Sequence, residues 1–146
     1  MKVLPFLFSA LFAVFTLFAQ AQERHNVDKN GVILKGYDPV AYFTEQKAVK
    51  GSAELTYTHR GDVYQFSSAA NREAFKSDPD KYAPLFGGYC GYAVSQGYTY
   101  DIDPRQFTFA DGRLVLQYNA SALASWKKDP KSLEKAKGNW ERLKKK

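Results

Sequence analysis

The dipeptide Asp111-Gly112 most constrains the fold, because it lies between two runs of alternating residues, 106–110 and 113–118. Asp-Gly adopts the left-handed backbone of a two-residue turn, so this pattern predicts a β-hairpin. Two aromatic-rich runs, 55–59 and 63–67, flank an Arg-Gly-Asp turn and predict a second hairpin. The strands of this chain are therefore expected in two hairpins.

Short helices are predicted between these hairpins. Asp38-Pro39 supplies an N-cap and a first-turn proline, which indicates a helical turn directly after it, and Asp78-Pro79 is expected to start another turn, through Tyr82. Ser67 or Ser68 is expected to cap a helix over 69–76. A glycine-rich stretch predicts a short helix over 89–95.

Two helices are predicted after the second hairpin. Asn119 is expected to cap one that runs to Lys127, and Asp129-Pro130 to cap the last one. The last helix carries its apolar residues on one face, at Leu133, Ala136, Trp140 and Leu143. The sequence thus predicts an α+β fold: a small domain of two β-hairpins interleaved with short helices and ending in a C-terminal helix.

The first 21 residues have the pattern of a cleavable signal peptide. Lys2 precedes an apolar run over 3–18, which ends in the small-x-small sequence Ala19-Gln20-Ala21. The run is shorter than the roughly 20 residues that a bilayer requires, which favours a signal peptide over an anchor. We expect a mature chain from Gln22, no stable membrane anchor after cleavage, and a periplasmic or secreted protein.

Residues 22–30 are polar and are expected to be a flexible leader to a domain over 31–146. The formal net charge is +6, and much of the excess lies near the C-terminus. Basic segments bind nucleic acids or anionic membranes in some proteins. No nucleic-acid recognition motif accompanies this charge, so we interpret it as a solvated helix face and expect no nucleic-acid partner.

Cys90 is the only cysteine, so it forms no internal disulfide. Three roles remain open for it: a buried structural side chain, a metal ligand and a reactive thiol. His59 is the imidazole outside the leader segment that is available to complete a site with Cys90. A phosphate-binding glycine loop, CxxC and HExxH are absent from the sequence, and we expect no enzyme.

The tyrosines suggest a second kind of site. A tyrosine ring offers a flat apolar wall with a polar tip, which suits a small-molecule pocket. Tyrosines at strand and helix spacing also serve as core residues, so both roles stay open. The candidates for ligand binding are Tyr64, Tyr89 and Tyr92.

Several stretches together resemble the YHS domain family. The similarity is carried by 36–43 (GYDPVAYF), 64–75 (YQFSSAANREAF) and 79–82 (PDKY). The stretches 87–90 (GGYC) and 111–114 (DGRL), with Asp103-Pro104, resemble the exported, stand-alone branch of the family. The resemblance implies a small α+β domain of the kind found beside copper-transport ATPases and metal-handling proteins, which binds heavy metal through cysteines.

This sequence departs from the metal-associated pattern at the ligands themselves. Three positions that resemble the family's cysteines are occupied by Ala41, Ser67 and Asn71. Serine and asparagine are poor ligands for Cu(I) and Zn²⁺, so the family's thiolate site cannot be transferred to this chain.

Two leading hypotheses follow, beside a third, in which Cys90 is the nucleophile of a thiol enzyme. The first is an exported, non-enzymatic accessory protein that handles a metal, with copper as the candidate and Cys90 and His59 as its ligands. It requires that Cys90 be reachable from solvent and close to His59. The second is a module that binds a small ligand or a protein partner through a tyrosine-lined surface, with Cys90 in a structural role. It requires an open aromatic pocket.

Overall fold

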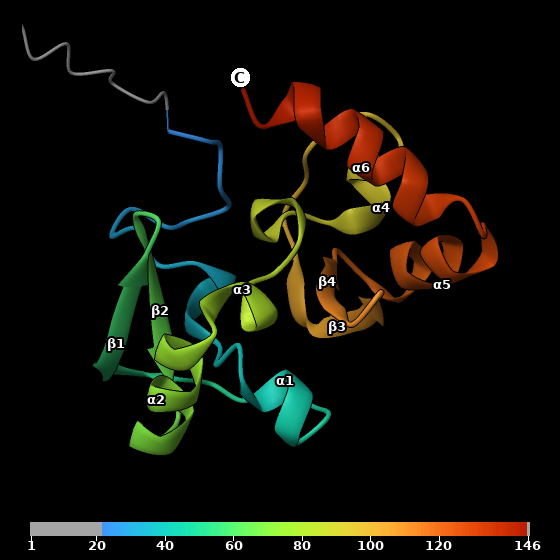
Figure 1. Ribbon diagram of the computed structural model, residues 1–146. Helices are drawn as coiled ribbons and strands as arrows, with labels where there is room; N and C mark the ends of the chain where they lie inside the picture. The colour runs from blue at the N-terminus through green and yellow to red at the C-terminus, as the bar shows by residue number, and fades with distance from the viewer. Residues whose placement is uncertain (1–21, 146) are drawn as a thin grey trace, which may run out of the picture.

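The computed structural model describes residues 22–145, and the signal peptide expected over 1–21 lies outside them. The described chain has the predicted α+β fold (Figure 1). Its elements are, in order, η1 (Leu34–Gly36), α1 (Ala41–Thr44), β1 (Ser52–His59), β2 (Asp62–Phe66), α2 (Ala69–Ser77), α3 (Pro79–Tyr82), η2 (Phe86–Gly88), α4 (Gly91–Ser95), β3 (Asp103–Ala110), β4 (Arg113–Gln117), α5 (Ala120–Lys128) and α6 (Ser132–Leu143).

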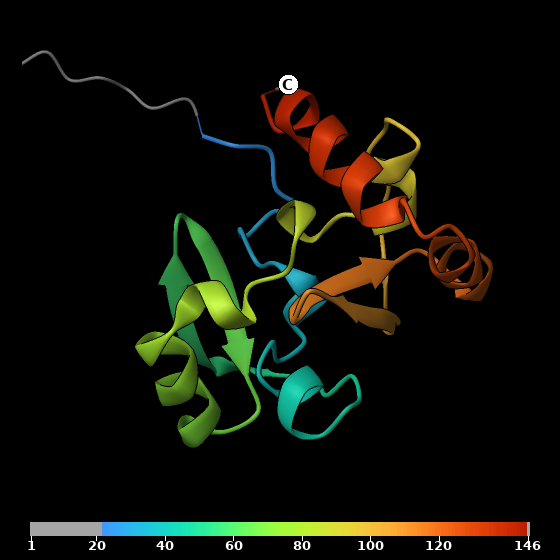
Figure 2. The same cartoon turned by 45° about the vertical axis from the view of Figure 1, so that its right-hand side comes forward.

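The two hairpins lie on opposite sides of the molecule. The β1–β2 hairpin carries α2, whereas β3–β4 lies beside α5 and α6, as Figures 1 and 2 show. Each hairpin is a separate two-stranded sheet. A parallel bridge between Val32 and Val63 ties the N-terminal segment to β2, and Leu85 N–H donates to Leu114 O at 2.9 Å. These links hold the two halves on one core.

Both hairpins are confirmed, and each begins earlier than its pattern indicated. The register of β1–β2 shifts between Ser52 and Thr56, and that of β3–β4 shifts between Asp103 and Phe107. Each irregularity interrupts the alternation of inward and outward side chains. The sequence pattern therefore marks only the regular part of each first strand.

The predicted caps of α2 and α5 are present. Ser68 accepts a hydrogen bond from Asn71 N–H at 3.1 Å, and Asn119 accepts one from Ala122 N–H at 2.8 Å. The start of α6 differs from the prediction, because Asp129 accepts Lys131 N–H and forms a turn before the helix, which begins at Ser132. Asp129 thus shapes the entry to α6 without capping it.

Helix α6 packs its predicted apolar face against α4. Ala136 and Leu143 are buried, and the side chain of Asn139 donates to Val94 O at 2.9 Å and to Ser95 O at 3.1 Å. Helix α4 begins at Gly91, two residues later than expected, because Cys90 N–H donates to Tyr100 O. That hydrogen bond joins the start of α4 to the loop that precedes β3.

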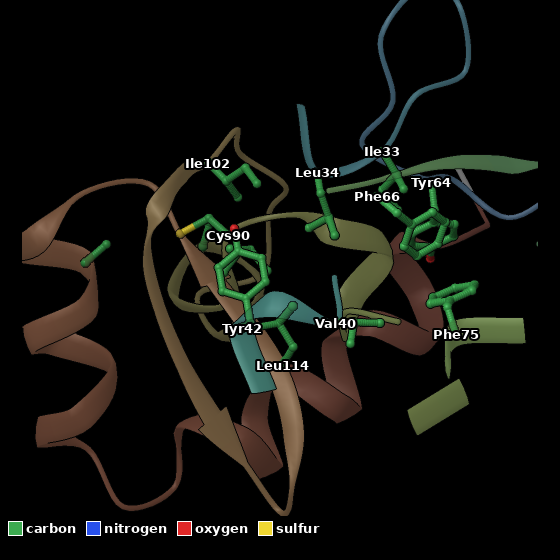
Figure 3. Packing of buried hydrophobic residues seen from close by; sticks show 13 residues of the cluster. Ile33, Leu34, Val40, Tyr42, Tyr64, Phe66, Phe75, Cys90, Ile102 and Leu114 are labelled. Atoms are coloured by element: carbon green, nitrogen blue, oxygen red, sulfur yellow. The ribbon is translucent and has the colours of Figure 1, made fainter. Parts of the chain in front are cut away.

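The main core gathers side chains from both halves around Phe75 and Tyr42 (Figure 3). The ring of Phe75 lies 4.5 Å from that of Tyr64 and 5.3 Å from that of Phe66, measured between centroids. Tyr42 is buried as well, and its hydroxyl donates to Pro104 O at 2.7 Å. Burial of each such side chain contributes about 1.5–3 kcal/mol, so this cluster supplies much of the stability.

The segment 22–30, expected to be a flexible leader, makes several contacts with the domain. Arg24 N–H donates to Lys144 O, and Asn26 N–H donates to Gly87 O. Val27 forms an antiparallel bridge with Ile33. The segment thus runs across the molecule between α6 and the β1–β2 turn.

Within residues 22–145, no helix combines the length and the apolar character that a membrane crossing requires.

Candidate functional site

The three positions that resemble the family's cysteines converge on one buried carboxylate. Asp38 is 0% exposed, and its Oδ2 accepts hydrogen bonds from Ser67 N–H at 2.8 Å, Ser67 Oγ at 2.7 Å and Asn71 Nδ2 at 2.8 Å. Its Oδ1 accepts from Val40 N–H at 2.8 Å and from Ala41 N–H at 3.3 Å. We call this group, Asp38 with Val40, Ala41, Ser67 and Asn71, the Asp38 node.

The Asp38 node is built as a structural centre. Its five hydrogen bonds fasten the start of α1 to the end of β2 and to α2. Such bonds to a carboxylate are about twice as strong as neutral ones. Among residues 22–145 no group of three or more metal-binding side chains is positioned to hold an ion.

Cys90 lies at the start of α4 and is 1% exposed. Its thiol donates to Gln117 Oε1 at 3.3 Å, and its sulfur accepts from Tyr118 N–H at 3.3 Å. Gln117 Oε1 also accepts Tyr92 N–H at 2.9 Å, which fixes the oxygen toward the sulfur. The protonated thiol fits these partners, whereas a thiolate would face the amide oxygen without a proton between them.

The structure does not bring His59 to Cys90. His59 lies at the end of β1, where Nε2 is 3.3 Å from Asp80 Oδ1 and the ring meets Phe75 edge-on. The two side chains line separate cavities. As the molecule is arranged, Cys90 and His59 do not share a site.

The three predicted ligand-binding tyrosines have different surroundings. Tyr64 is buried in the core, and this burial raises the pKa of its hydroxyl. Tyr89 donates to His25 O at 3.2 Å and packs against Trp140. Tyr92 lines a cavity that Cys90 also borders.

That cavity has a volume of about 420 Å³ and is rich in tyrosine. We call it the tyrosine pocket; it is lined by Cys90, Tyr92, Ala93, Tyr98, Tyr100, Tyr118, Asn119, Ser121 and Ala122. Tyr98, Tyr100 and Tyr118 are 50%, 49% and 46% exposed, so this is where aromatic side chains reach the surface. Small-molecule sites have volumes of about 300–1,000 Å³ and mostly apolar walls with a few polar groups.

The loop between α4 and β3 holds two of these tyrosines in place. Tyr98 N–H donates to Ala93 O at 3.1 Å, and Tyr100 O accepts from Cys90 N–H at 3.0 Å. Gly97 takes a positive φ of 96°, which favours glycine, and turns the chain out of α4. Tyr118 follows β4 directly and raises the pKa of the Tyr100 hydroxyl. Backbone hydrogen bonds therefore hold the segment that carries Tyr98 and Tyr100 in place.

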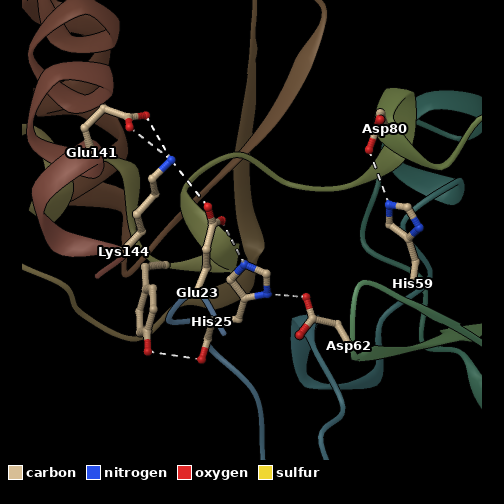
Figure 4. Close-up of polar contacts among 8 residues, drawn as sticks. Glu23, His25, His59, Asp62, Asp80, Glu141 and Lys144 are labelled. Carbon is tan, nitrogen blue, oxygen red and sulfur yellow. Dashed lines mark hydrogen bonds and ion pairs between the residues drawn. The ribbon is translucent and has the colours of Figure 1, made fainter. Parts of the chain in front are cut away.

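A second cavity, of about 460 Å³, lies where the N-terminal segment meets the β1–β2 turn and α6. His25 Nδ1 is hydrogen-bonded to the buried carboxylate of Asp62 (Figure 4). This bond holds the pKa of His25 above its ordinary value, although burial of the ring opposes it. His59 with Asp80 forms a second pair in the same cavity.

These histidine–carboxylate pairs hold segments together. No serine, threonine or cysteine of the described chain lines this cavity, so its lining contains no Ser–His or Cys–His pair. Sequence analysis assigned His25 to the leader and missed its role. Asp62 is 37 residues away in the chain, so the local sequence contains no signal of the pair.

The comparisons with known proteins place the resemblance on residues 40–85, which match the YHS domain. The matched part of the chain runs from α1 through both strands of the first hairpin to α3. No curated protein and no solved structure matches the chain. Asp38 lies two residues before the matched segment and the other four residues of the Asp38 node lie within it, whereas the tyrosine pocket lies wholly outside it.

Proposed function

We propose that this YHS-domain protein is a non-enzymatic binding module that takes a small ligand in its tyrosine pocket, with Cys90 in a structural role. The observation that carries the proposal is the pocket itself, in which three half-exposed tyrosines stand around an opening of about 420 Å³. Moving the exposed apolar surface of an aromatic ring out of water is favourable. A ligand that covers these rings would therefore gain binding free energy from the hydrophobic effect.

The surroundings of Cys90 support a structural role. The thiol has both a hydrogen-bond acceptor and a donor within the protein, at Gln117 and Tyr118. A metal or an electrophile would have to break these bonds before it reached the sulfur. In this proposal Cys90 is a structural residue at the border of the pocket, and the tyrosines form the binding surface.

A fragment titration of the mature protein, followed by amide NMR, tests this proposal. We expect shifts concentrated at Cys90, Tyr98, Tyr100 and Tyr118, and we expect Tyr100→Ala to weaken them. Val27→Ala removes an exposed apolar side chain outside the pocket and is the control. Chemical-shift changes that are the same in Tyr100→Ala, or that occur mainly outside the pocket, would refute the assignment of binding to the tyrosine pocket.

Metal handling is the second candidate, and the YHS match favours it because the family is associated with metal binding. For copper, the candidate ligands from the sequence are Cys90 and His59, which would have to move together from separate cavities. Titration of Cu(I) against a chromogenic chelator decides this. One-to-one binding that Cys90→Ser abolishes would support a copper role, and no competition by the wild-type protein would dismiss it.

Export is part of the proposal as well. The apolar run and the Ala19-Gln20-Ala21 sequence support cleavage before Gln22 and a periplasmic or secreted location. Intact-mass analysis of the protein from the periplasm and the medium should give a chain that begins at Gln22. A full-length chain retained in the cytoplasm would exclude export.

A further inference from the structure

The exposed rings of the tyrosine pocket meet at right angles. Tyr100 and Tyr118 lie 4.7 Å apart between centroids with an interplanar angle of 87°, and Tyr98 and Tyr100 lie 6.4 Å apart at 82°. Tyr100 is thus perpendicular to both neighbours. The three rings form a corner, whereas a slot would need parallel faces.

The shape of this corner selects the shape of the ligand. A flat aromatic ligand can stack on two rings at once only where their faces are parallel, and perpendicular rings leave it no such slot. Perpendicular walls contact a compact group from several directions at once. The face of each ring also carries the negative part of the aromatic quadrupole, which attracts cations.

The charges around the pocket select the kind of cation. No lysine, arginine, aspartate or glutamate of the described chain lines it. Asp101 follows Tyr100, but its carboxylate accepts hydrogen bonds from Lys35 at 2.7 Å and from Asn26 at 3.1 Å. A primary ammonium would find no free carboxylate here, whereas a quaternary ammonium needs no hydrogen-bond acceptor.

We propose that the tyrosine pocket binds a quaternary ammonium group, held by cation–π attraction to Tyr98, Tyr100 and Tyr118. This inference rests on the proposed function and names the class of ligand. The trimethylated head lies against the rings, and the rest of the ligand extends toward the polar side chains of Asn119 and Ser121. Cys90 borders the pocket, and its thiol is hydrogen-bonded to Gln117 within the protein.

The test compares choline with 3,3-dimethyl-1-butanol, its uncharged carbon analogue of the same shape. Calorimetry and amide NMR on the mature protein are expected to show choline bound in the pocket, and the analogue bound at least about fivefold more weakly. Equal affinity for the two probes would overturn the cation assignment. It would leave the proposed function intact, because both would still occupy the pocket.

Variants of Tyr100 provide the matched control. Tyr100→Leu removes the ring and should weaken choline binding about tenfold, whereas Tyr100→Phe keeps the ring and should change it by less than about threefold. Equal losses in both variants would point to the hydroxyl and refute the cation–π account. Fragments that bind the pocket while choline does not would refute this inference alone, and no binding by any probe would refute the proposed function with it.

The salt dependence of the affinity for choline provides an independent test. The chain has a formal net charge of +6, so long-range electrostatics repel a cation. Added salt screens that repulsion, and the affinity for choline should stay constant or rise. A steep fall in affinity with salt would indicate an ion pair with a carboxylate and would contradict the proposal.

Discussion

The Asp38 node and the tyrosine pocket use polar groups in opposite ways. At the node, a fully buried carboxylate accepts five hydrogen bonds, all from within the protein. At the pocket, three tyrosines keep about half of their surface in solvent. The node lies where the resembling family carries cysteines, and the pocket lies beyond the matched segment. The polar groups of the node are thus satisfied within the protein, whereas the side chains of the tyrosine pocket remain available to the ligand that we propose.

The largest effect is expected at the node. Asp38→Ala leaves three backbone N–H groups, the Ser67 hydroxyl and the Asn71 amide without their acceptor, and should lower the free energy of unfolding by about 3–5 kcal/mol. Urea denaturation measures this, and Glu54→Ala at an exposed position of β1 is the control, with a change within about 0.5 kcal/mol. A change of less than about 1 kcal/mol on Asp38→Ala would show that the Asp38 node does not stabilise the fold.

The His25–Asp62 pair can be compared with the Asp38 node, because it is also polar and largely buried. It differs in that the His25 imidazole changes its protonation state near neutral pH. The pKa of His25 is raised in the folded protein by its hydrogen bond to Asp62. Its stabilisation is therefore full below the unfolded pKa of about 6.5 and is lost as the pH rises through the folded pKa.

Urea denaturation from pH 6 to pH 9 should show this loss of stability in the wild-type protein and a flatter profile in His25→Ala. His59→Ala, which removes the more exposed pair, is the comparison variant. Identical profiles for His25→Ala and the wild type would show that this pair contributes nothing to the pH dependence.

The floor of the pocket depends on a close approach at Gly91. A Cβ there would collide with Val115 Cγ1 and press on Trp126, so Gly91→Ala should destabilise the protein by about 1–3 kcal/mol. Gly138→Ala is the matched control in α6, where a Cβ meets nothing and should stabilise by about 0.4–1 kcal/mol. Thermal denaturation compares the two, and equal effects would contradict the packing described for α4.

The smallest effect on stability is expected at the pocket rim. Tyr100→Ala removes a half-exposed ring and should change the free energy of unfolding by no more than about 0.5 kcal/mol, while pocket binding is weakened. Chemical denaturation and ligand titration on the same sample separate the two properties. A loss of several kcal/mol would mean that Tyr100 is a core residue and that the pocket is a packing feature.

The fold was largely predictable, because its turns and caps are local in sequence. Asp111-Gly112 closes the β3–β4 hairpin, and Ser68 and Asn119 cap their helices as expected. The irregular starts of β1 and β3 were not predictable, since a bulge interrupts the alternation from which a strand is inferred.

The site was less predictable, because a tyrosine has the same side chain in a core and in a pocket. Of the candidates Tyr64, Tyr89 and Tyr92, the tyrosine pocket contains one. Tyr98 and Tyr100 carried a weak signal, since they follow Gly97 in a segment without helical or strand periodicity. The perpendicular contact of Tyr100 with Tyr118 joins two segments that are 18 residues apart in the chain, so the local sequence does not reveal it.

One amide NMR experiment tests the central claim that binding belongs to the tyrosine pocket and stability to the Asp38 node. Mature protein is titrated with choline while the amides of Cys90, Tyr98 and Tyr118 are followed beside those of Val40, Ala41 and Ser67. We predict saturable shifts in the first group and none in the second. Shifts at the Asp38 node, with the tyrosine pocket unchanged, would contradict the account.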